Sequence, residues 1–311
     1  MTQVLVTGGA GAIGSHLVAR LVQGGYQVSV IDDLSSGHKE LLPDSVNFTQ
    51  GSINDEAALA QAFSVKPRWV FHLAALFANQ QSMDRPVHDL TVNGIGTLNV
   101  LRFASENKVE KFLYTSSSCV YGVQQQVMKE SDGLSHLDTP YAATKMLGEH
   151  YCRIWAKNHG LPTVVMRLFN SYGPHEFPGK YRNVIPNFFA LALNHQPLPI
   201  LGTGKETRDF TFVSDVVDGM LVSMSADTGD YEVFNLGNGV GTSIQVLAEA
   251  INGLTGNSAG FTFSPRRSWD HVEHRSADIS KAKQGLGYEP KIKLLQGLSE
   301  TFNWFTENNV K

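Results

Sequence analysis

The chain has 311 residues, of which 42% are apolar and 17% are charged. This balance is typical of a globular protein, and the length exceeds what one small core accommodates, so we expect two lobes or one large α/β unit. The net charge of -4 gives no general positive field for nucleic acid. Any anionic ligand must therefore be held by a few local cationic side chains.

The sequence offers no segment for export or membrane insertion. The first residues, MTQVLVTGG, enter a strand without the basic and apolar stretch of a secretory signal. The longest apolar run, Phe188 to Leu193, is too short to span a bilayer. Cys119 and Cys152 make neither a disulfide framework nor a metal-ligand spacing. We therefore expect a cytoplasmic protein with no metal site, no membrane partner and no nucleic-acid partner.

Short apolar runs alternate with helical patterns through the first half of the chain. Strand alternating with helix predicts parallel strands with right-handed crossovers, hence an α/β fold with a doubly wound parallel (Rossmann) sheet. Ligands of such sheets bind beyond the carboxyl ends of the strands. The expected strands are Val4 to Thr7, Val28 to Ile31, Trp69 to Leu73, Phe112 to Thr115 and Thr163 to Leu168, and a helix is expected over His16 to Gln23.

Prolines break up the pattern after about residue 171 and predict a smaller C-terminal α/β lobe. Asp209 to Val213 and Glu232 to Leu236 nevertheless predict buried strands, with a helix over Ser214 to Met224 between them. We therefore expect the chain to return to the first domain. This gives a first domain of residues 1–170 plus about 209–237, and a second lobe of about 171–208 plus 238–311.

A glycine-rich turn, TGGAGAIG, lies between the first expected strand and helix. Gly8, Gly11 and Gly14 allow a tight turn in which backbone N–H groups and the helix N-terminus approach a pyrophosphate. Asp32 ends the second strand, where a carboxylate can accept hydrogen bonds from the adenosine ribose hydroxyls. Asp32 and Asp33 would repel a ribose phosphate, so the pattern favours NAD over NADP.

A second motif, Tyr141-Ala-Ala-Thr-Lys145, comes after a hydroxyl-rich run at Ser116 to Ser118. Tyr141 and Lys145 are one helical turn apart, so their side chains can share a face. At roughly 4 Å and an effective dielectric constant of about 20, the ammonium stabilises a phenolate by about 4 kcal/mol. That is enough to bring a tyrosine pKa from about 10 towards 7. The pair therefore suits proton transfer near neutral pH.

Together these motifs resemble the extended short-chain dehydrogenase/reductases, the NAD-dependent sugar-nucleotide epimerase/dehydratase family that includes UDP-glucose 4-epimerase. The resemblance covers essentially the whole length. Its matching segments are TGGAGAIGSH at 7–16, DDLSSG at 32–37, HLAA at 72–75, TSSSCVYG at 115–122, YAATK at 141–145, RLFNSYGP at 167–174, RDF at 208–210 and NLG at 235–237.

The resemblance implies a role for each residue of the second motif. Ser117 would hydrogen-bond the sugar hydroxyl that is oxidised, Tyr141 would act as the base, and Lys145 would orient the cofactor ribose and lower the Tyr141 pKa. Hydride would pass from sugar carbon 4 to NAD, giving a tightly held ketone. The expected cofactor-binding residues are Gly8, Gly11, Ala12, Ile13, Gly14, Asp32, Asp33, Ser36, Gly37, Ser52, Ile53, Leu73, Ala74, Ala75, Asn93, Tyr141 and Lys145.

The resemblance also implies a site for a nucleoside-diphosphate sugar. Arg208 and Arg267 match family arginines that grip the diphosphate, a geometry suited to guanidinium groups. Asn170 matches an asparagine that contacts the diphosphate or the sugar. The other expected substrate residues are Ser117 and Ser118, with Lys180 as a further candidate.

Two positions depart from the family pattern on the cofactor side. Ser52 replaces an Asp that usually contacts adenine, and Phe77 replaces a Lys that contacts the cofactor in UDP-galactose 4-epimerase. Both changes would loosen NAD without removing the main anchors.

The residues after Ser117 bear on the fate of the ketone. The 4,6-dehydratases place an Asp-Glu pair there, where this chain has Ser118 and Cys119, so dehydration is disfavoured. We therefore expect a nucleoside-diphosphate-sugar 4-epimerase, in which the ketone turns over and takes the hydride back on its other face.

Cys119 keeps an alternative open. GDP-mannose 3,5-epimerase and GDP-fucose synthase carry a catalytic cysteine at this place, and a thiolate can remove a proton beside a 4-keto group. The partner acid of GDP-fucose synthase, a His, corresponds to Asn183 here, and the Lys of GDP-mannose 3,5-epimerase lies near Lys180 but not in register. The alternatives are thus a 3,5-epimerase using Cys119, a Cys119 that only packs in a 4-epimerase pocket, and a dehydratase or reductase of the same family.

A non-enzymatic NAD-sensing scaffold is a further alternative, which the presence of both Tyr141 and Lys145 disfavours. Related enzymes form a four-helix dimer contact from the helices near Val87 to Glu106 and Tyr141 to His159, so the resemblance implies a homodimer. The motifs themselves select neither a nucleotide base nor a sugar.

Overall fold

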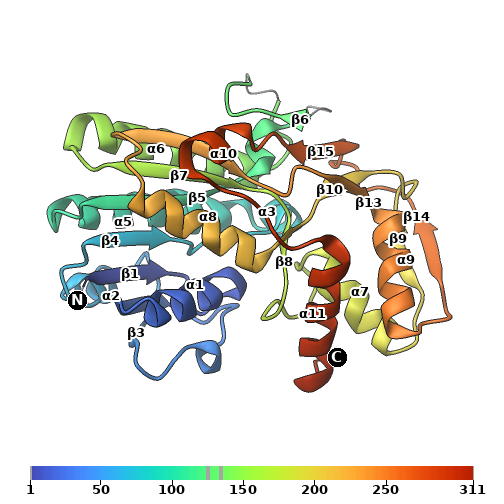
Figure 1. Ribbon diagram of the computed structural model, residues 1–311. Coiled ribbons are helices and arrows are strands. Elements are labelled where there is room, and N and C mark those ends of the chain that lie inside the picture. Colours follow the sequence, from blue (N-terminus) through green and yellow to red (C-terminus); the bar gives the residue numbers. More distant parts are fainter. Residues whose placement is uncertain (1, 124–126, 133–135, 311) are drawn as a thin grey trace.

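The computed structural model describes residues 2–123, 127–132 and 136–310. At its centre lies a sheet whose strands all pair in parallel (Figure 1). This confirms the predicted doubly wound α/β fold. The strands are β1 (Gln3–Thr7), β2 (Gln27–Asp32), β3 (Asn47–Gln50), β4 (Trp69–His72), β5 (Lys111–Ser117), β7 (Thr163–Leu168) and β12 (Tyr231–Leu236). They pair in the order β12-β7-β5-β4-β1-β2-β3.

The order of the strands reverses beside β1. The chain runs outward through β2 and β3 on one side of β1, and then returns to build β4, β5, β7 and β12 on the other. Thr7 pairs with both Ile31 and His72, so the carboxyl ends of β1, β2 and β4 are level. A crevice at such a switch point is where doubly wound sheets bind ligands.

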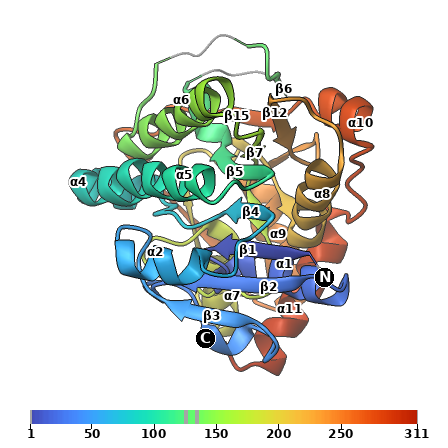
Figure 2. The same cartoon turned by 90° about the vertical axis from the view of Figure 1, so that its left-hand side faces the viewer.

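Helices cover both faces of the sheet, as Figure 2 shows. Alternate residues of β1 point to opposite layers, because Val4 and Val6 belong to one apolar cluster and Leu5 to another. One face carries α1 (Ala12–Gln23), α8 (Val213–Ser225) and α10 (Ser280–Leu286), and the other carries α2 (Glu56–Phe63), α5 (Thr97–Glu106) and α6 (Pro140–His159). The segments α3 (Asn79–Asp84), α4 (Pro86–Asp89) and η2 (Leu90–Gly96) lead into α5.

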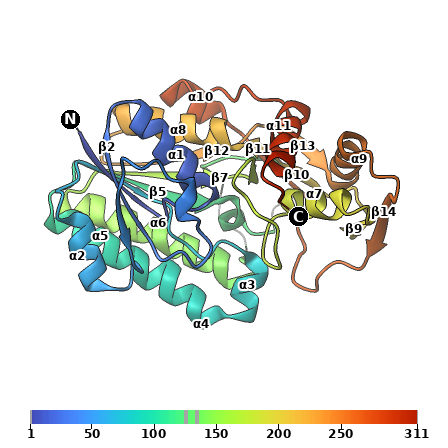
Figure 3. The same ribbon diagram turned by 90° about the horizontal axis from the view of Figure 1, so that it is seen from below.

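A second lobe packs beyond the carboxyl ends of the central strands and has its own apolar core (Figure 3). Its helices are α7 (Val184–Leu193), α9 (Ile244–Thr255) and α11 (Leu294–Glu307). Small sheets join β8 (Ser171–Tyr172) to β11 (Thr211–Phe212), and β9 (Leu198–Leu201) to β14 (Phe261–Ser264). A further sheet has the order β13-β10-β15-β6, from β13 (Gly241–Ser243), β10 (Thr207–Asp209), β15 (His274–Ala277) and β6 (Val127–Met128).

The single strand predicted over residues 209–213 is wrong. The segment divides into β10 and β11, which belong to different small sheets, and α8 already begins at Val213. The division occurs because the Asp209 carboxylate is buried and accepts the backbone N–H groups of Asn238, Gly239 and Ala277. The predicted helix over 214–224 corresponds to α8, and the predicted strand over 232–236 to β12 at the edge of the central sheet. The proposed domain boundaries remain a prediction.

Within the described part of the chain, no helix is long and apolar enough to cross a membrane. The same residues contain no group of three or more His, Cys, Asp or Glu side chains that could hold a metal ion.

Candidate active site

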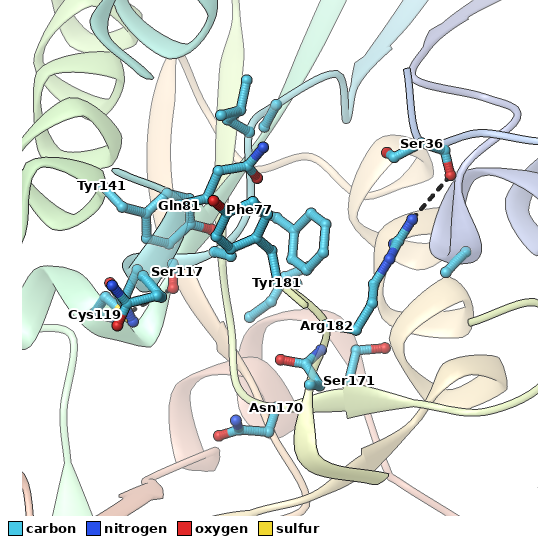
Figure 4. A pocket seen from close by; sticks show the side chains of 18 of the residues that line it. Ser36, Phe77, Gln81, Ser117, Cys119, Tyr141, Asn170, Ser171, Tyr181 and Arg182 are labelled. Atoms are coloured by element: carbon cyan, nitrogen blue, oxygen red, sulfur yellow. Dashed lines mark hydrogen bonds between the residues drawn. The ribbon is translucent and has the colours of Figure 1, made fainter. Parts of the chain in front are cut away.

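A cavity of about 910 Å³ extends from the glycine turn, across the carboxyl ends of the central strands, to the second lobe. Every predicted site residue except Asn93 lines it, including all the predicted substrate residues. The structure therefore gathers residues from distant parts of the sequence into one continuous site, part of which is drawn in Figure 4.

The glycine turn has no room for side chains. Gly8 adopts a φ of +70°, and a Cβ atom there would lie 2.6 Å from the backbone nitrogen of Ala74. A Cβ atom on Gly14 would lie 2.2 Å from the Gly8 carbonyl oxygen. No side chain caps the start of α1 at Gly11, so the first N–H groups of this helix face the cavity. This arrangement fits the pyrophosphate of a dinucleotide.

Asp32 joins the glycine turn to the loop after β2. Its carboxylate accepts the N–H groups of Ala10 and Leu34, each at 2.9 Å. Burial raises the pKa of Asp32, and these two hydrogen bonds oppose the rise. Asp32 and Asp33 both line the cavity where the adenosine ribose of a dinucleotide would lie, next to Ser36 and Gly37.

Asn93 lies outside the cavity wall, in contrast to its predicted place among the cofactor residues. Its buried side chain accepts the Leu76 N–H and donates to the Leu76 carbonyl, both at 2.9 Å. It also donates to Asp89. Asn93 therefore shapes the loop after Ala75, and that loop lines the cavity.

Phe77, on this same loop, has a cation beside it. The Arg182 guanidinium lies over the Phe77 ring, 4.9 Å from its centroid, and donates a 3.0 Å hydrogen bond to the Ser36 carbonyl (Figure 4). Phe77 stands where a family Lys was expected, so Arg182 returns a positive charge to this wall from the loop before α7.

Ser117, Tyr141 and Cys119 lie side by side in the cavity (Figure 4). Ser117 is the last residue of β5, and Tyr141 is in the first turn of α6, whose N-terminus is capped by the Thr139 hydroxyl accepting the Ala142 N–H. Lys145 comes one turn later. Its ammonium donates to the Thr115 carbonyl at 2.8 Å and lies 5.9 Å from the centroid of the Tyr141 ring.

The pKa of Tyr141 differs from the expectation of a value near 7. Burial is the largest effect and raises the pKa of Tyr141 above its ordinary value, while a hydrogen bond with Ser117 opposes the rise. Burial also lowers the pKa of Lys145 to about 8, opposed by the nearby Asp89 carboxylate. Desolvation of the buried phenol is therefore the reason that the Tyr141 pKa departs from the expected direction.

A buried ion pair supports this arrangement from behind. Arg167 on β7 donates to both carboxylate oxygens of Glu149 on α6, at 2.9 and 2.8 Å. The Ser116 hydroxyl on β5 donates to the same carboxylate. The pair therefore ties together the strand that ends at Ser117 and the helix that carries Tyr141.

Cys119 lines the cavity and contacts two polar side chains. The Asn79 amide nitrogen and Arg275 Nη1 each lie 3.4 Å from its Sγ atom. Cys152, in contrast, is buried in α6 away from the cavity wall. Of the two thiols, Cys119 is the one placed to meet a ligand.

The second lobe supplies a group of arginines to the cavity. Arg208 donates to the carbonyls of Thr207 and Val272, and Arg267 lies over the Trp269 ring at 5.6 Å. Asn170 also lines the cavity, whereas Lys180 is exposed at its edge, where it lies 3.4 Å from Asp84. Four further arginines in the wall were not predicted: Arg85, Arg182, Arg266 and Arg275. Only Arg266 had a signal in the sequence, its position next to Arg267.

Residues 4–237 match the model of the NAD dependent epimerase/dehydratase family. The chain belongs to this family. The chain is 34% identical over 97% of its own length, and 97% of the other, to a UDP-N-acetyl-alpha-D-glucosaminuronate decarboxylase from Bacillus cytotoxicus.

Solved structures of family members agree closely with this chain. An epimerase from Methanothermobacter thermautotrophicus superposes with a TM-score of 0.96 and 46% identity, over 99% of this chain and 93% of the other. UDP-glucose 4-epimerase from Thermotoga maritima, solved with UDP-glucose, superposes with a TM-score of 0.95 and 36% identity, over 99% of this chain and 100% of the other. Other relatives have been solved with NAD bound. The protein is an NAD-dependent enzyme of this family.

Proposed function

We propose that this family member is a nucleoside-diphosphate-sugar 4-epimerase. The observation that carries the proposal is the grouping of Ser117, Tyr141 and Lys145 at the end of β5, with Ser118 and Cys119 in the two positions after Ser117. No carboxylate stands there to act as the acid or base of a dehydration. The likeness to a UDP-glucose 4-epimerase supports the proposal.

NAD held by the glycine turn and Asp32 would supply the hydride acceptor for sugar carbon 4. Ser117 holds the carbon 4 hydroxyl by a hydrogen bond. Tyr141 takes the proton of that hydroxyl as the hydride leaves, and Lys145 holds positive charge next to the phenolate. Tyr141 gives the proton back when the hydride returns.

Inversion requires the keto sugar to turn while the nucleotide stays in place. Arg208 and Arg267 lie on the second lobe, where they can hold the diphosphate by charge-assisted hydrogen bonds. The sugar can then present either face to the cofactor without leaving the cavity. UDP is the nucleotide to test first, because the Bacillus cytotoxicus and Thermotoga maritima relatives act on or bind UDP sugars.

Product analysis tests the proposal. Purified enzyme is incubated in D₂O with UDP-glucose, UDP-N-acetylglucosamine or UDP-glucuronate, and the products are identified by NMR. We expect inversion at carbon 4 without uptake of deuterium, because the hydride returns internally. Inactivity with all three sugars, or inversion at carbon 3 or 5 alone, would contradict the proposal.

A 3,5-epimerase is the second candidate function. The observation that favours it is the Cys119 thiol, which faces the cavity next to Ser117 and Tyr141 and contacts the Arg275 guanidinium. A thiolate there could remove the proton on a carbon beside the 4-keto group. Its signature is solvent deuterium at carbon 3 or 5, lost in Cys119→Ser.

We also propose a homodimer formed through the helices of residues 86–106 and 140–159. Val87, Leu90, Ile95 and Ile154 on these helices are exposed apolar side chains, which a second copy could cover. Light scattering tests this proposal. The expected mass of the wild type is that of two chains, and the double variant Val87→Glu with Ile95→Glu should have the mass of one chain. A wild-type mass of one chain would contradict it.

A further inference from the structure

Arg275 is a buried guanidinium in the wall of the cavity. It lies on β15, is 9% exposed, and donates from Nη2 to the Gly122 carbonyl at 2.9 Å. Its Nη1 lies 3.4 Å from the Cys119 sulfur. Its Nε has no hydrogen-bond partner among the described residues. Part of the donor capacity of this side chain is therefore unused.

Arg275 also has no ion-pair partner in the described part of the chain, in contrast to its neighbours. Asp270 lies 3.7 Å from Arg208 and 3.4 Å from Arg266, so one carboxylate serves both of them. The charge of Arg275 is one of the causes that lower the pKa of Arg208. A buried cation without an anion is unfavourable unless a ligand supplies the negative charge.

The position of Arg275 indicates which part of a ligand it meets. Its neighbour Cys119 stands two residues after Ser117 and beside Tyr141 (Figure 4). Carbon 4 of the sugar must lie next to Ser117 and Tyr141 for their chemistry. Arg275 is therefore placed against the sugar ring, whereas Arg208 and Arg267 are available for the diphosphate.

We propose that Arg275 binds a carboxylate carried by the sugar, so that the substrate is a nucleoside-diphosphate uronate. Carbon 5 is bonded to carbon 4, so a carboxylate at carbon 6 comes within reach of a guanidinium placed beside the carbon 4 site. The planar fork of arginine matches the two oxygens of a carboxylate. The inference rests on the proposed 4-epimerase, whose substrate class it specifies.

A purely structural role is the competing explanation. Arg275 could serve only to hold the turn η3 (Ser118–Tyr121) through its bond to Gly122. Such a role would affect neutral and acidic sugars equally, because the turn carries Ser118 and Cys119 whichever sugar is bound. The comparison of two substrates therefore separates the two roles.

The test is the affinity of the NAD-loaded enzyme for UDP-glucuronate and UDP-glucose, measured by titration calorimetry. We expect the wild type to bind UDP-glucuronate at least about tenfold more tightly, because hydrogen bonds to charged groups contribute more than neutral ones. In Arg275→Met the affinity for UDP-glucuronate should fall by about tenfold to a hundredfold, while that for UDP-glucose stays within about threefold. Arg275→Lys keeps the charge and should retain part of the preference.

Equal wild-type affinities for the two sugars, or equal losses for both in Arg275→Met, would overturn the inference. The wild-type comparison decides the matter even where a variant fails to fold. The proposed reaction is judged separately by product NMR. Carbon 4 inversion of a neutral sugar without a preference for the uronate refutes only this inference, and a uronate preference without carbon 4 inversion refutes only the proposed reaction.

Discussion

Removing the charge of Glu149 tests whether the buried pair behind the active site holds the fold together. The Arg167 and Glu149 side chains are only 6% and 4% exposed, and the carboxylate binds both Arg167 and Ser116. Glu149→Gln keeps the shape of the side chain but leaves the Arg167 charge buried without its anion. Breaking a buried pair from one side costs about 3–5 kcal/mol, whereas an exposed pair contributes about 0–1 kcal/mol.

The chain provides a matched control in the exposed pair of Arg68 and Glu110, whose side chains are 51% and 57% exposed. Equilibrium urea unfolding, followed by tryptophan fluorescence and circular dichroism, gives the free energy of unfolding of each protein. We expect Glu149→Gln to lose about 3 kcal/mol or more and Glu110→Gln less than about 1 kcal/mol. Similar losses for the two variants would refute the reasoning that burial sets the strength of the pair.

Three further predictions concern chemistry, cofactor choice and pH. Tyr141→Phe should lower kcat by about 10²- to 10⁴-fold, with the NAD content of the purified protein unchanged; epimerase activity within tenfold of the wild type would contradict its role as base. The wild type should bind NAD at least tenfold more tightly than NADP by fluorescence titration, and Asp32→Asn should narrow this gap; equal affinities in the wild type would argue against the Asp32 assignment. Burial raises the pKa of Glu176 to about 7, opposed by Asn183 and Arg182, so the folded state binds more protons than the unfolded state between about pH 4.5 and 7, and its stability falls as pH rises through this window. In urea unfolding, Glu176→Gln should therefore be more stable than the wild type above pH 7, by roughly 1–3 kcal/mol, and should have no advantage below about pH 4.5. A stability difference between the two proteins that does not change with pH would contradict the raised pKa of Glu176.

The central sheet was predictable because its strands are continuous apolar runs separated by helical patterns. Strand β3 gave no such signal, since only Thr49 of its four residues is buried. The single strand predicted over 209–213 was wrong for the opposite reason. Its residues are buried and apolar enough for a strand, but the Asp209 carboxylate accepts three backbone N–H groups from segments far along the chain. Hydrogen bonds of this kind leave no pattern in the local sequence.

The candidate site divides in the same way between what is local and what is brought together by the fold. The glycine turn and the Tyr141 to Lys145 spacing are each complete within a few residues, so their chemistry can be inferred from the sequence. The charge of the cavity cannot be inferred from the sequence in this way. Arg182 and Arg275 belong to no motif, and they reach the cavity wall from a separate loop and strand.

This distinction changes how the departures from the family pattern are judged. Phe77 alone suggested a cofactor held less tightly, but Arg182 places a guanidinium over that ring and bonds to Ser36 in the loop after β2. Likewise Cys119 alone suggested a thiol base, and the fold adds the Arg275 guanidinium beside its sulfur. In both places the substituted residue stands beside an arginine from the other lobe. The positive charge of the cavity, rather than either substitution, is therefore the property that should determine which sugar nucleotide this enzyme accepts.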